Sequence, residues 1–377
     1  MNDQTKISVK SVGEMISVCL NNNLTFAAYR LPNQTAQAIM VQENRNAEEL
    51  TNLSAVTSLK GFLVAPFLRS ESNRMFVIKP DFYFSGEVSD EQFDKINNIT
   101  HPAPENNSFK RPYQVSKKEY LQQIEAIMKV IKTGKILKAV LSRVKLVHSV
   151  NEKFLPGVFV KLCDLFPRAF VYVFKTENHF WIGATPEPFA FLKNNIFQTS
   201  SVAGTKENSE KFLGIENWGN KEKQEQHFVS EHIDKVLLSN HWENIEQRGP
   251  YVQQAGNVLH LRTDFISKAN VSNGNVGDLL NNLHPTPAIC GSPTKEALEI
   301  INFLEKHDRE YYGGFLGPVG MQNPIILFVN LRCMKITGSR LVLYSGGGIT
   351  IDSVPEDEWH ETEIKTGTLL SVIKNVS

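Results

Sequence analysis

Two pairs of glutamates repeat the same spacing in distant parts of the chain. Glu358 and Glu361, with Lys365, lie at positions i, i+3 and i+7, which share one face of a helix. Glu222 and Glu225 repeat the i, i+3 pair. Two helices that each present two carboxylates can together bind Mg²⁺, because this cation prefers oxygen ligands. The alternative interpretation of each pair is a solvated acidic helix face.

Two glycine-containing stretches, SGGG at 345–348 and SVAGTK at 201–206, precede these carboxylates. Gly346 and Gly348 follow a β-like run, and Gly204 and Thr205 lie in the second stretch. Glycine turns let backbone N–H groups approach an anion closely, because no Cβ blocks them. Anion-binding turns beside carboxylates and a lysine indicate a divalent metal that bridges the protein to an acidic substrate.

Lys138 and Glu187 have the side-chain types that proton transfer requires. Lys138 shares a predicted strand face with Val140 and Val144, and such mostly apolar surroundings favour the neutral base. The alternative is a lysine whose stem lies along the apolar row while its charge reaches water. Glu187 lies between two prolines, in a rigid connection that suits a general acid; an exposed loop glutamate is the alternative.

Arg332 lies among apolar neighbours within a predicted strand at 324–336. A guanidinium in such a strand needs an anionic partner. The sequence leaves two partners open, a substrate carboxylate held bidentately or an internal salt bridge.

Hydrophobic periodicity and turn residues predict the elements that must position these side chains. Helices are expected at 116–134, at 220–238, from residue 292 and from Ser353, which forms a capping box with Glu356. The segment 284–293, with Ala288, is too rich in proline for regular structure, and 308–317, with Tyr312, is hinged by glycines. Strands are expected at 61–65, 75–79, 137–147, 169–175, 179–183, 189–192, 196–202, 258–264, 324–336 and 340–345.

Composition sets bounds on the class of protein. The 377 residues carry 40 Lys and Arg against 40 Asp and Glu, which argues against nucleic acid or an anionic membrane as a partner. No apolar run is long enough to span a bilayer, and the N-terminus lacks an apolar signal core. The four cysteines lack CxxC spacing, as expected of buried thiols in a reducing compartment. We expect a soluble, cytoplasmic protein.

Eight stretches, taken in order, resemble the chorismate-utilising enzymes, and most closely the isochorismate synthases. They are LKAVLSR, GATPEP, SVAGTK, KEKQEQH, LHPTPAICGSP, DREYYGGFLG, FVNLRC and SGGGI…DEWHETEIK. The resemblance implies an α+β fold of two stacked β-sheets wrapped by helices, as in anthranilate synthase component I. Residues 1–112 would form the N-terminal part of this unit, and residues 113–377 the chorismate-binding catalytic region.

The resemblance also implies a Mg²⁺-dependent reaction on chorismate. Lys138 would activate the water that attacks C2, and Glu187 would protonate the departing C4 hydroxyl. The implied metal ligands are Glu225 and Glu361, with Glu222 and Glu358 close by. The implied substrate contacts are Gly204, Thr205, His260, Tyr312, Arg332, Gly346, Gly348 and Lys365.

Ala288 and Ala203 help to distinguish members of this family. Ammonia-using members and salicylate synthases carry threonine at the position of Ala288, and aminodeoxychorismate synthases of one kind carry a nucleophilic lysine at that of Ala203. The chain therefore resembles the isochorismate synthases, for which no glutaminase subunit is expected. Tyr312 is typical of salicylate synthases, so an enzyme that forms isochorismate and then eliminates pyruvate is the alternative.

A non-catalytic anion- or metal-binding protein on the same fold is a second alternative. The presence of both Lys138 and Glu187 argues against it, since binding needs neither residue. The sequence leaves open whether isochorismate would serve menaquinone or siderophore biosynthesis. No coiled-coil heptad indicates an obligate partner, so a monomer is expected.

Overall fold

Two nine-stranded antiparallel sheets form the body of the protein in the computed structural model, which describes residues 9–102, 111–148, 152–242, 244–255, 258–268, 276–321 and 324–374. The first sheet contains, in order, β16 (Gly291–Ser292), β9 (Lys138–His148), β20 (Arg340–Ile349), β19 (Cys333–Thr337), β11 (Phe180–Thr185), β10 (Phe170–Lys175), β2 (Thr25–Arg30), β3 (Gln37–Gln42) and β7 (Phe82–Ser85). The second contains β14 (Glu246–Ala255), β15 (Val258–Lys268), β13 (Ile196–Glu207), β12 (Pro188–Lys193), β18 (Ile325–Val329), β17 (Phe315–Val319), β5 (Gly61–Ala65), β6 (Met75–Ile78) and β4 (Glu48–Leu50). A separate pair joins β1 (Val9–Lys10) to β8 (Val88–Ser89).

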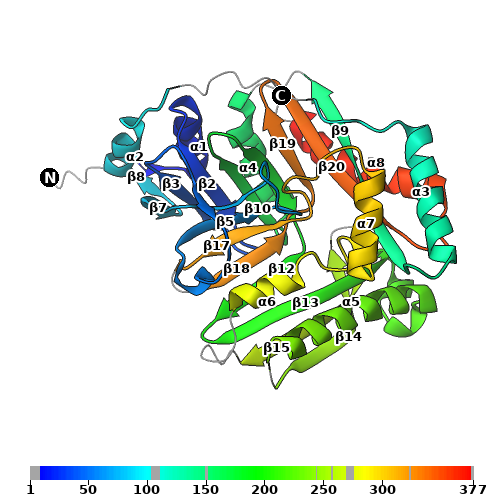
Figure 1. The fold of residues 1–377 in the computed structure, drawn as a ribbon. Helices are drawn as coiled ribbons and strands as arrows, with labels where there is room; N and C mark the ends of the chain where they lie inside the picture. Colours follow the sequence, from blue (N-terminus) through cyan, green and yellow to red (C-terminus); the bar gives the residue numbers. More distant parts are fainter. Residues whose placement is uncertain are drawn as a thin grey trace.

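Helices cover the outer faces of both sheets (Figure 1). The first sheet packs against α1 (Val12–Asn21), α4 (Leu155–Leu165) and α8 (Pro355–Lys374), with α2 (Asp90–Asn97) beside α1. The second packs against α5 (Asn220–Ser239) and α6 (Val276–Leu283), and α3 (Lys117–Lys132) and α7 (Thr294–Leu304) flank β9. Short 3₁₀ turns lie at Val56–Ser58, Glu152–Phe154, Glu210–Phe212 and Ile215–Asn217. The predicted α+β fold of two stacked sheets wrapped by helices is confirmed.

Aromatic side chains fill the layer between the two sheets. In β10, Phe170, Tyr172 and Phe174 point into this layer, whereas Val171 and Val173 belong to the core beneath the outer helices. The strand is therefore buried on both faces, which explains its continuous apolar run. Its first ring also stacks on a ring of β18 in the other sheet, with centroids 4.3 Å apart.

Two of the connections that take the chain from one sheet to the other lie side by side, and they are called here the first and the second crossing. β11 continues into β12 through Pro186 and Glu187, and β18 continues into β19 through residues 330–332. Backbone hydrogen bonds join the two crossings, from Val329 N–H to Glu187 O at 3.0 Å and from Ala184 N–H to Arg332 O at 3.1 Å. The prediction of one strand over 324–336 is therefore wrong, because this segment contributes one strand to each sheet.

Asn330 stabilises the second crossing. Its buried side chain donates to Tyr311 O at 2.9 Å and accepts from the Tyr172 hydroxyl at 2.5 Å. Arg332 then takes a φ of 47°, in the left-handed region that a non-glycine residue seldom adopts. At this crossing, side-chain hydrogen bonds thus replace the backbone hydrogen bonds of the sheet, and β18 ends without a glycine or a proline.

Arg30 ties the end of β2 to the loop after α4. Its side chain is fully buried and donates to five backbone carbonyls, at 2.6–3.2 Å: those of Leu31, Cys163, Phe166, Pro167 and Ala169. This arginine holds together a part of the first sheet that carries none of the predicted site residues.

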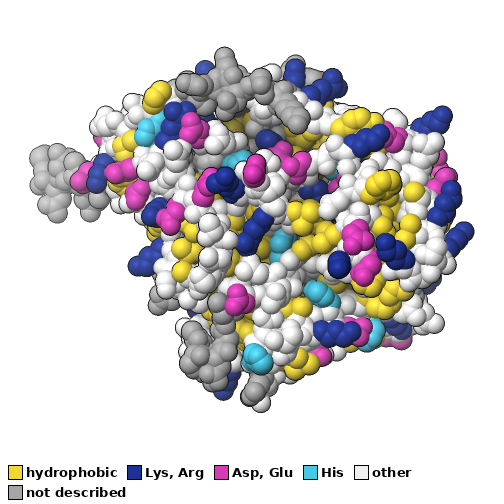
Figure 2. Space-filling model, viewed as in Figure 1, with side chains coloured by type: hydrophobic (Ala, Val, Ile, Leu, Met, Phe, Trp, Pro, Cys, Tyr) yellow, Lys and Arg dark blue, Asp and Glu magenta, His cyan; other side chains and the backbone are white. Residues whose placement is uncertain are grey.

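Charged side chains of both signs are interspersed over the face shown in Figure 2, and the described residues form no extended basic patch there. Within the described ranges, no helix is both long and apolar enough to cross a membrane. All four cysteines are buried and free, as the sequence predicted.

Candidate active site

Lys138, the first residue of β9, lies where the first sheet meets α5. It pairs through its backbone with Ser292 of β16, and the residue is 7% exposed. Its ammonium forms an ion pair with Glu225 of α5. A Cβ on Gly348 would lie 2.6 Å from Lys138 Cε, so the glycine leaves room for this side chain. The lysine therefore has a carboxylate partner in place of the mostly apolar surroundings predicted.

Glu187 lies in the first crossing between the sheets, where backbone hydrogen bonds hold it. Desolvation raises its pKa to about 7, although the ammonium groups of Lys138 and Lys365 act to lower it. A carboxyl with this pKa keeps its proton in a substantial fraction of the molecules near neutral pH, as a general acid requires.

Arg332 lies in the second crossing. Burial lowers its pKa from the usual range, while Tyr312 and Glu361 act in the opposite direction. Within the described part of the chain, no carboxylate lies close enough to form an ion pair with this guanidinium. The internal salt bridge that the sequence left open is thus not seen there, which favours an external anion as the partner.

One face of α8 presents its charged residues to β20. Lys365 donates to Gly346 O at 2.8 Å and pairs with Glu361 at 2.5 Å. Glu358 accepts a hydrogen bond from the Ser353 hydroxyl at 2.7 Å. The shared face predicted for these three residues agrees with this arrangement.

The predicted capping box at the start of α8 is not formed. Ser353 N–H donates to Thr350 O at 3.2 Å, and the Ser353 hydroxyl accepts from Thr350 N–H at 3.0 Å. Glu356 pairs with Lys117 at 2.6 Å. The serine hydroxyl is thus engaged by a turn and by Glu358, which lies on the site face.

The corresponding face of α5 meets β13. Glu222 pairs with Lys206 at 2.7 Å, one turn before Glu225. Gly204 lies at a bulge in β13 with a φ of 69°, and a Cβ there would lie 3.1 Å from Glu222 Cβ. His260 Nδ1 donates to Gly204 O at 2.9 Å, and burial lowers the pKa of this histidine. The bulge at Gly204 thus lies in contact with both α5 and the imidazole of His260.

The two glycine stretches belong to strands, so the predicted turns are wrong. Gly346 and Gly348 pair with β9 within β20. Ala203 and Thr205 pair with β15, with Gly204 as the bulge between them, and the side chain of Thr205 lies outside the described part. β19 pairs with β20 only as far as Leu343, which leaves the backbone at Gly346 open to Lys365. The glycines provide space for side chains at the site.

Tyr312 and Ala288 come from the two irregular segments. Tyr312 is buried, and a Cβ on Gly346 would lie 3.0 Å from its hydroxyl. Ala288 lies in the segment 284–293, which runs beside β9: Cys290 O accepts from Val140 N–H at 2.9 Å. The segment of Ala288 therefore contacts β9, which carries Lys138. Tyr312 lies beside Gly346 of β20, whose carbonyl accepts from Lys365.

The four glutamates have the chemistry of a Mg²⁺ site, but they are not gathered into one. Among the residues that the structure describes, no group of three or more His, Cys, Asp or Glu side chains could hold a metal ion. Glu222, Glu225 and Glu361 are paired with lysines. An all-oxygen donor set still fits a hard cation, and Gly347 leaves space 3.1 Å from Glu358 Oε2. Magnesium binding stays a prediction that requires the lysines to release these carboxylates.

Sequence reasoning missed two buried arginines, Arg143 within β9 and Arg309 beside it. Arg143 bonds to Thr362 and Glu363 of α8, and its guanidinium lies 3.9 Å from the Trp359 ring centroid. Arg309 bonds to the backbone of β9. The sequence did contain a signal for Arg143, because a guanidinium in an apolar strand needs a partner. It contained no such signal for Arg309, which lies in a loop.

The sequence matches the family described as chorismate binding enzymes over residues 77–374, so the chain belongs to this family. It is 28% identical over 266 residues to isochorismate synthase MenF of Bacillus subtilis, covering 69% of this chain and 56% of that protein. It is 27% identical over 271 residues to anthranilate synthase component 1 of Bacillus pumilus, covering 68% and 51%. The chain thus spans little more than half the length of these relatives.

A solved structure shows the same fold. MenF, the menaquinone-specific isochorismate synthase from Escherichia coli, aligns with a TM-score of 0.74 at 21% identity, over 93% of this chain and 88% of that one. The predicted membership of the chorismate-utilising enzymes is confirmed, with isochorismate synthases among the relatives. The roles of individual residues stay predictions.

Glu187→Gln should change how thermal stability depends on pH. The folded-state pKa of about 7 lies above the ordinary value of 4.5, so the folded wild type loses stability relative to the unfolded chain as pH rises between these values. The glutamine variant lacks this loss. Its melting temperature relative to wild type should therefore be higher, by a few degrees, at about pH 8.5 than at about pH 5.

Differential scanning fluorimetry at the two pH values measures this difference. Glu71→Gln, which alters an exposed carboxylate, is the control and should show the same difference from wild type at both. A pH-independent difference for Glu187→Gln would contradict the raised pKa.

Proposed function

We propose that the chain is an isochorismate synthase, which converts chorismate to isochorismate by adding water at C2 and releasing the hydroxyl from C4. The observation that supports this proposal most is that Lys138 lies within electrostatic reach of Glu187, a carboxyl whose raised pKa leaves part of the molecules protonated near neutral pH. The relatives named isochorismate synthase, together with Ala288 and Ala203, support this subclass.

The charges of the site suit a dianionic substrate. Chorismate carries two carboxylates, and Arg332 and Lys365 would neutralise them. Arg332 can hold a carboxylate bidentately, since no described carboxylate pairs with it. Lys365 would exchange its contact with Glu361 for the substrate. Tyr312 would line the ring from the side of β20.

Two proton transfers complete the reaction. Lys138, once it has left Glu225 and lost its proton, would take a proton from the water that attacks C2. Glu187 would donate its proton to the C4 hydroxyl, which is a poor leaving group unless it departs as water. One water enters and one leaves, so the product is an isomer of the substrate.

The carboxylates of α5 and α8 would hold Mg²⁺, through Glu225 and Glu361 with Glu222 and Glu358 nearby. When bound, the cation would supply positive charge beside a substrate carboxylate. The protein's part is to carry these oxygen donors on two helices that face β20 and β13.

Purified protein incubated with chorismate and Mg²⁺ should form isochorismate without ammonia or a glutaminase subunit. Chromatographic identification of the product, with pyruvate measured in the same samples, tests this expectation. Glu187→Gln is the matched inactive control, since it keeps the shape of the side chain and removes its proton. Anthranilate or aminodeoxychorismate as the main product with ammonia would contradict the subclass, and stoichiometric pyruvate would indicate a salicylate synthase.

Glu225→Gln and Glu361→Gln should weaken Mg²⁺ binding while the fold is kept. Each change removes an anionic ligand from a hard cation, so the dissociation constant for Mg²⁺ should rise at least about 10-fold. Isothermal titration calorimetry with Mg²⁺ in the presence of chorismate measures it. Glu356→Gln, an exposed carboxylate on the same helix as Glu361, is the control. Unchanged affinity in both site variants would show that these glutamates form only charged surface.

A further inference from the structure

Along most of one edge of β9, side chains and not a neighbouring strand form hydrogen bonds to the backbone. β20 pairs along the other edge, from residue 139 to 148, but β16 covers only the first two residues of this one. Beyond them, Arg309 Nη2 donates to Val140 O at 2.6 Å, and Ser142 N–H donates to Glu305 Oε1 at 2.6 Å. Lys138 begins this same strand, so two side chains fix the backbone that carries the proposed base.

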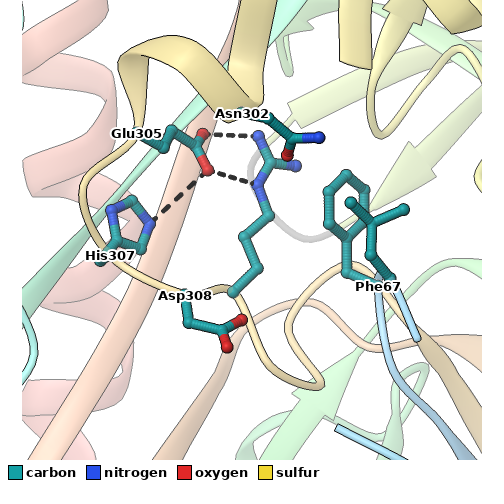
Figure 3. Close-up of a pocket in the computed structure, with 7 residues that line it drawn as sticks. Phe67, Asn302, Glu305, His307 and Asp308 are labelled. Atoms are coloured by element: carbon teal, nitrogen blue, oxygen red, sulfur yellow. Dashed lines mark hydrogen bonds and ion pairs between the residues drawn. The ribbon is translucent and has the colours of Figure 1, made fainter. Parts of the chain in front are cut away.

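Glu305 and Arg309 form a buried bidentate ion pair. Nε and Nη2 of the arginine lie 2.8 and 2.6 Å from the carboxylate oxygens, and the two side chains are only 4% and 3% exposed. Burial alone would raise the pKa of Glu305, but Arg309 holds it below its ordinary value, so the pair stays charged. Figure 3 shows His307 pointing toward the Glu305 carboxylate. This rigid pair sets the geometry of everything bonded to it.

The same residue contacts two other segments of the site, one through its guanidinium and one through its backbone. Its Nη1 donates to Ile289 O at 3.0 Å, next to Ala288. Its own backbone carbonyl accepts from Tyr312 N–H at 2.8 Å. Arg309 therefore connects the strand of Lys138, the segment of Ala288 and the loop of Tyr312.

We propose that Arg309, held by Glu305, is a positioning residue of the active site, which fixes Lys138 relative to Ala288 and Tyr312. This inference rests on the proposed function. A guanidinium suits the task because its planar fork bonds to several acceptors in fixed directions, which an ammonium cannot reproduce. Displacement of a reacting group by about 1 Å can cost about 10²-fold in rate.

Arg30 can serve as a control, because it represents a buried arginine that only stabilises the fold. Arg30 is also buried and donates to backbone carbonyls, but it binds elements distant from the site. Arg309 differs in a second respect, because a cavity of about 220 Å³ opens beside it, with the exposed Asn302 and Asp308 in its lining. A small cation can therefore reach the place of the Arg309 side chain.

The test compares Arg309→Ala with Arg30→Ala at a temperature below both melting transitions. Both variants should melt below wild type. Arg309→Ala alone should lose about 10²-fold in kcat for chorismate, with KM little changed because Arg332 and Lys365 lie on other elements. Guanidinium chloride, far below denaturing concentrations, should restore part of that kcat, whereas urea, a neutral molecule of similar shape, should not.

The outcomes separate this inference from the function on which it rests. An inactive wild type contradicts the proposed function and with it this inference. An active wild type in which Arg309→Ala loses no more kcat than Arg30→Ala contradicts the inference alone. If Arg309→Ala yields no folded protein, Glu305→Gln tests the same pair: lower kcat at unchanged KM supports the proposal, and wild-type kcat overturns it.

Discussion

The geometry of the site depends on the hydrogen bonds that join the two crossings between the sheets. Each crossing gives its backbone to the other, through Val329 with Glu187 and Ala184 with Arg332. The Thr185 hydroxyl adds a bond of 2.6 Å to Val329 O. The backbones that carry Glu187 and Arg332, two residues distant in sequence, are thereby joined to each other.

Charge compensation is the second constraint. In the described structure, Lys138, Lys206 and Lys365 of the site each pair with a carboxylate of α5 or α8. A substrate with two carboxylates, together with a divalent cation, offers both sets of groups new partners. Binding would then exchange protein ion pairs for ligand ion pairs with little change in net charge, which limits the desolvation cost.

Much of the fold could be predicted from the sequence, because the periodic pattern of α3 and the continuous apolar run of β10 each indicate the type of element. The break at Asn330 could not, since apolar residues on both sides continue the same alternation and the strand ends through side-chain hydrogen bonds. The glycines of β20 predict a turn in the sequence, but in the packed structure they lie in a strand and leave space for Lys138 and Tyr312. Glu305 and Arg309 belong to no periodic hydrophobic pattern, so the sequence did not predict that this ion pair is buried.

The central claim is that Lys138 and Glu187 act as one base and acid pair, and steady-state kinetics on the single and double variants test it most directly. Lys138→Ala and Glu187→Ala should each lower kcat by at least about 10²-fold, with chorismate binding largely kept when measured directly. The double variant should lose less than the product of the two single losses, because neither group works fully without the other. A near wild-type kcat in Lys138→Ala would contradict the account.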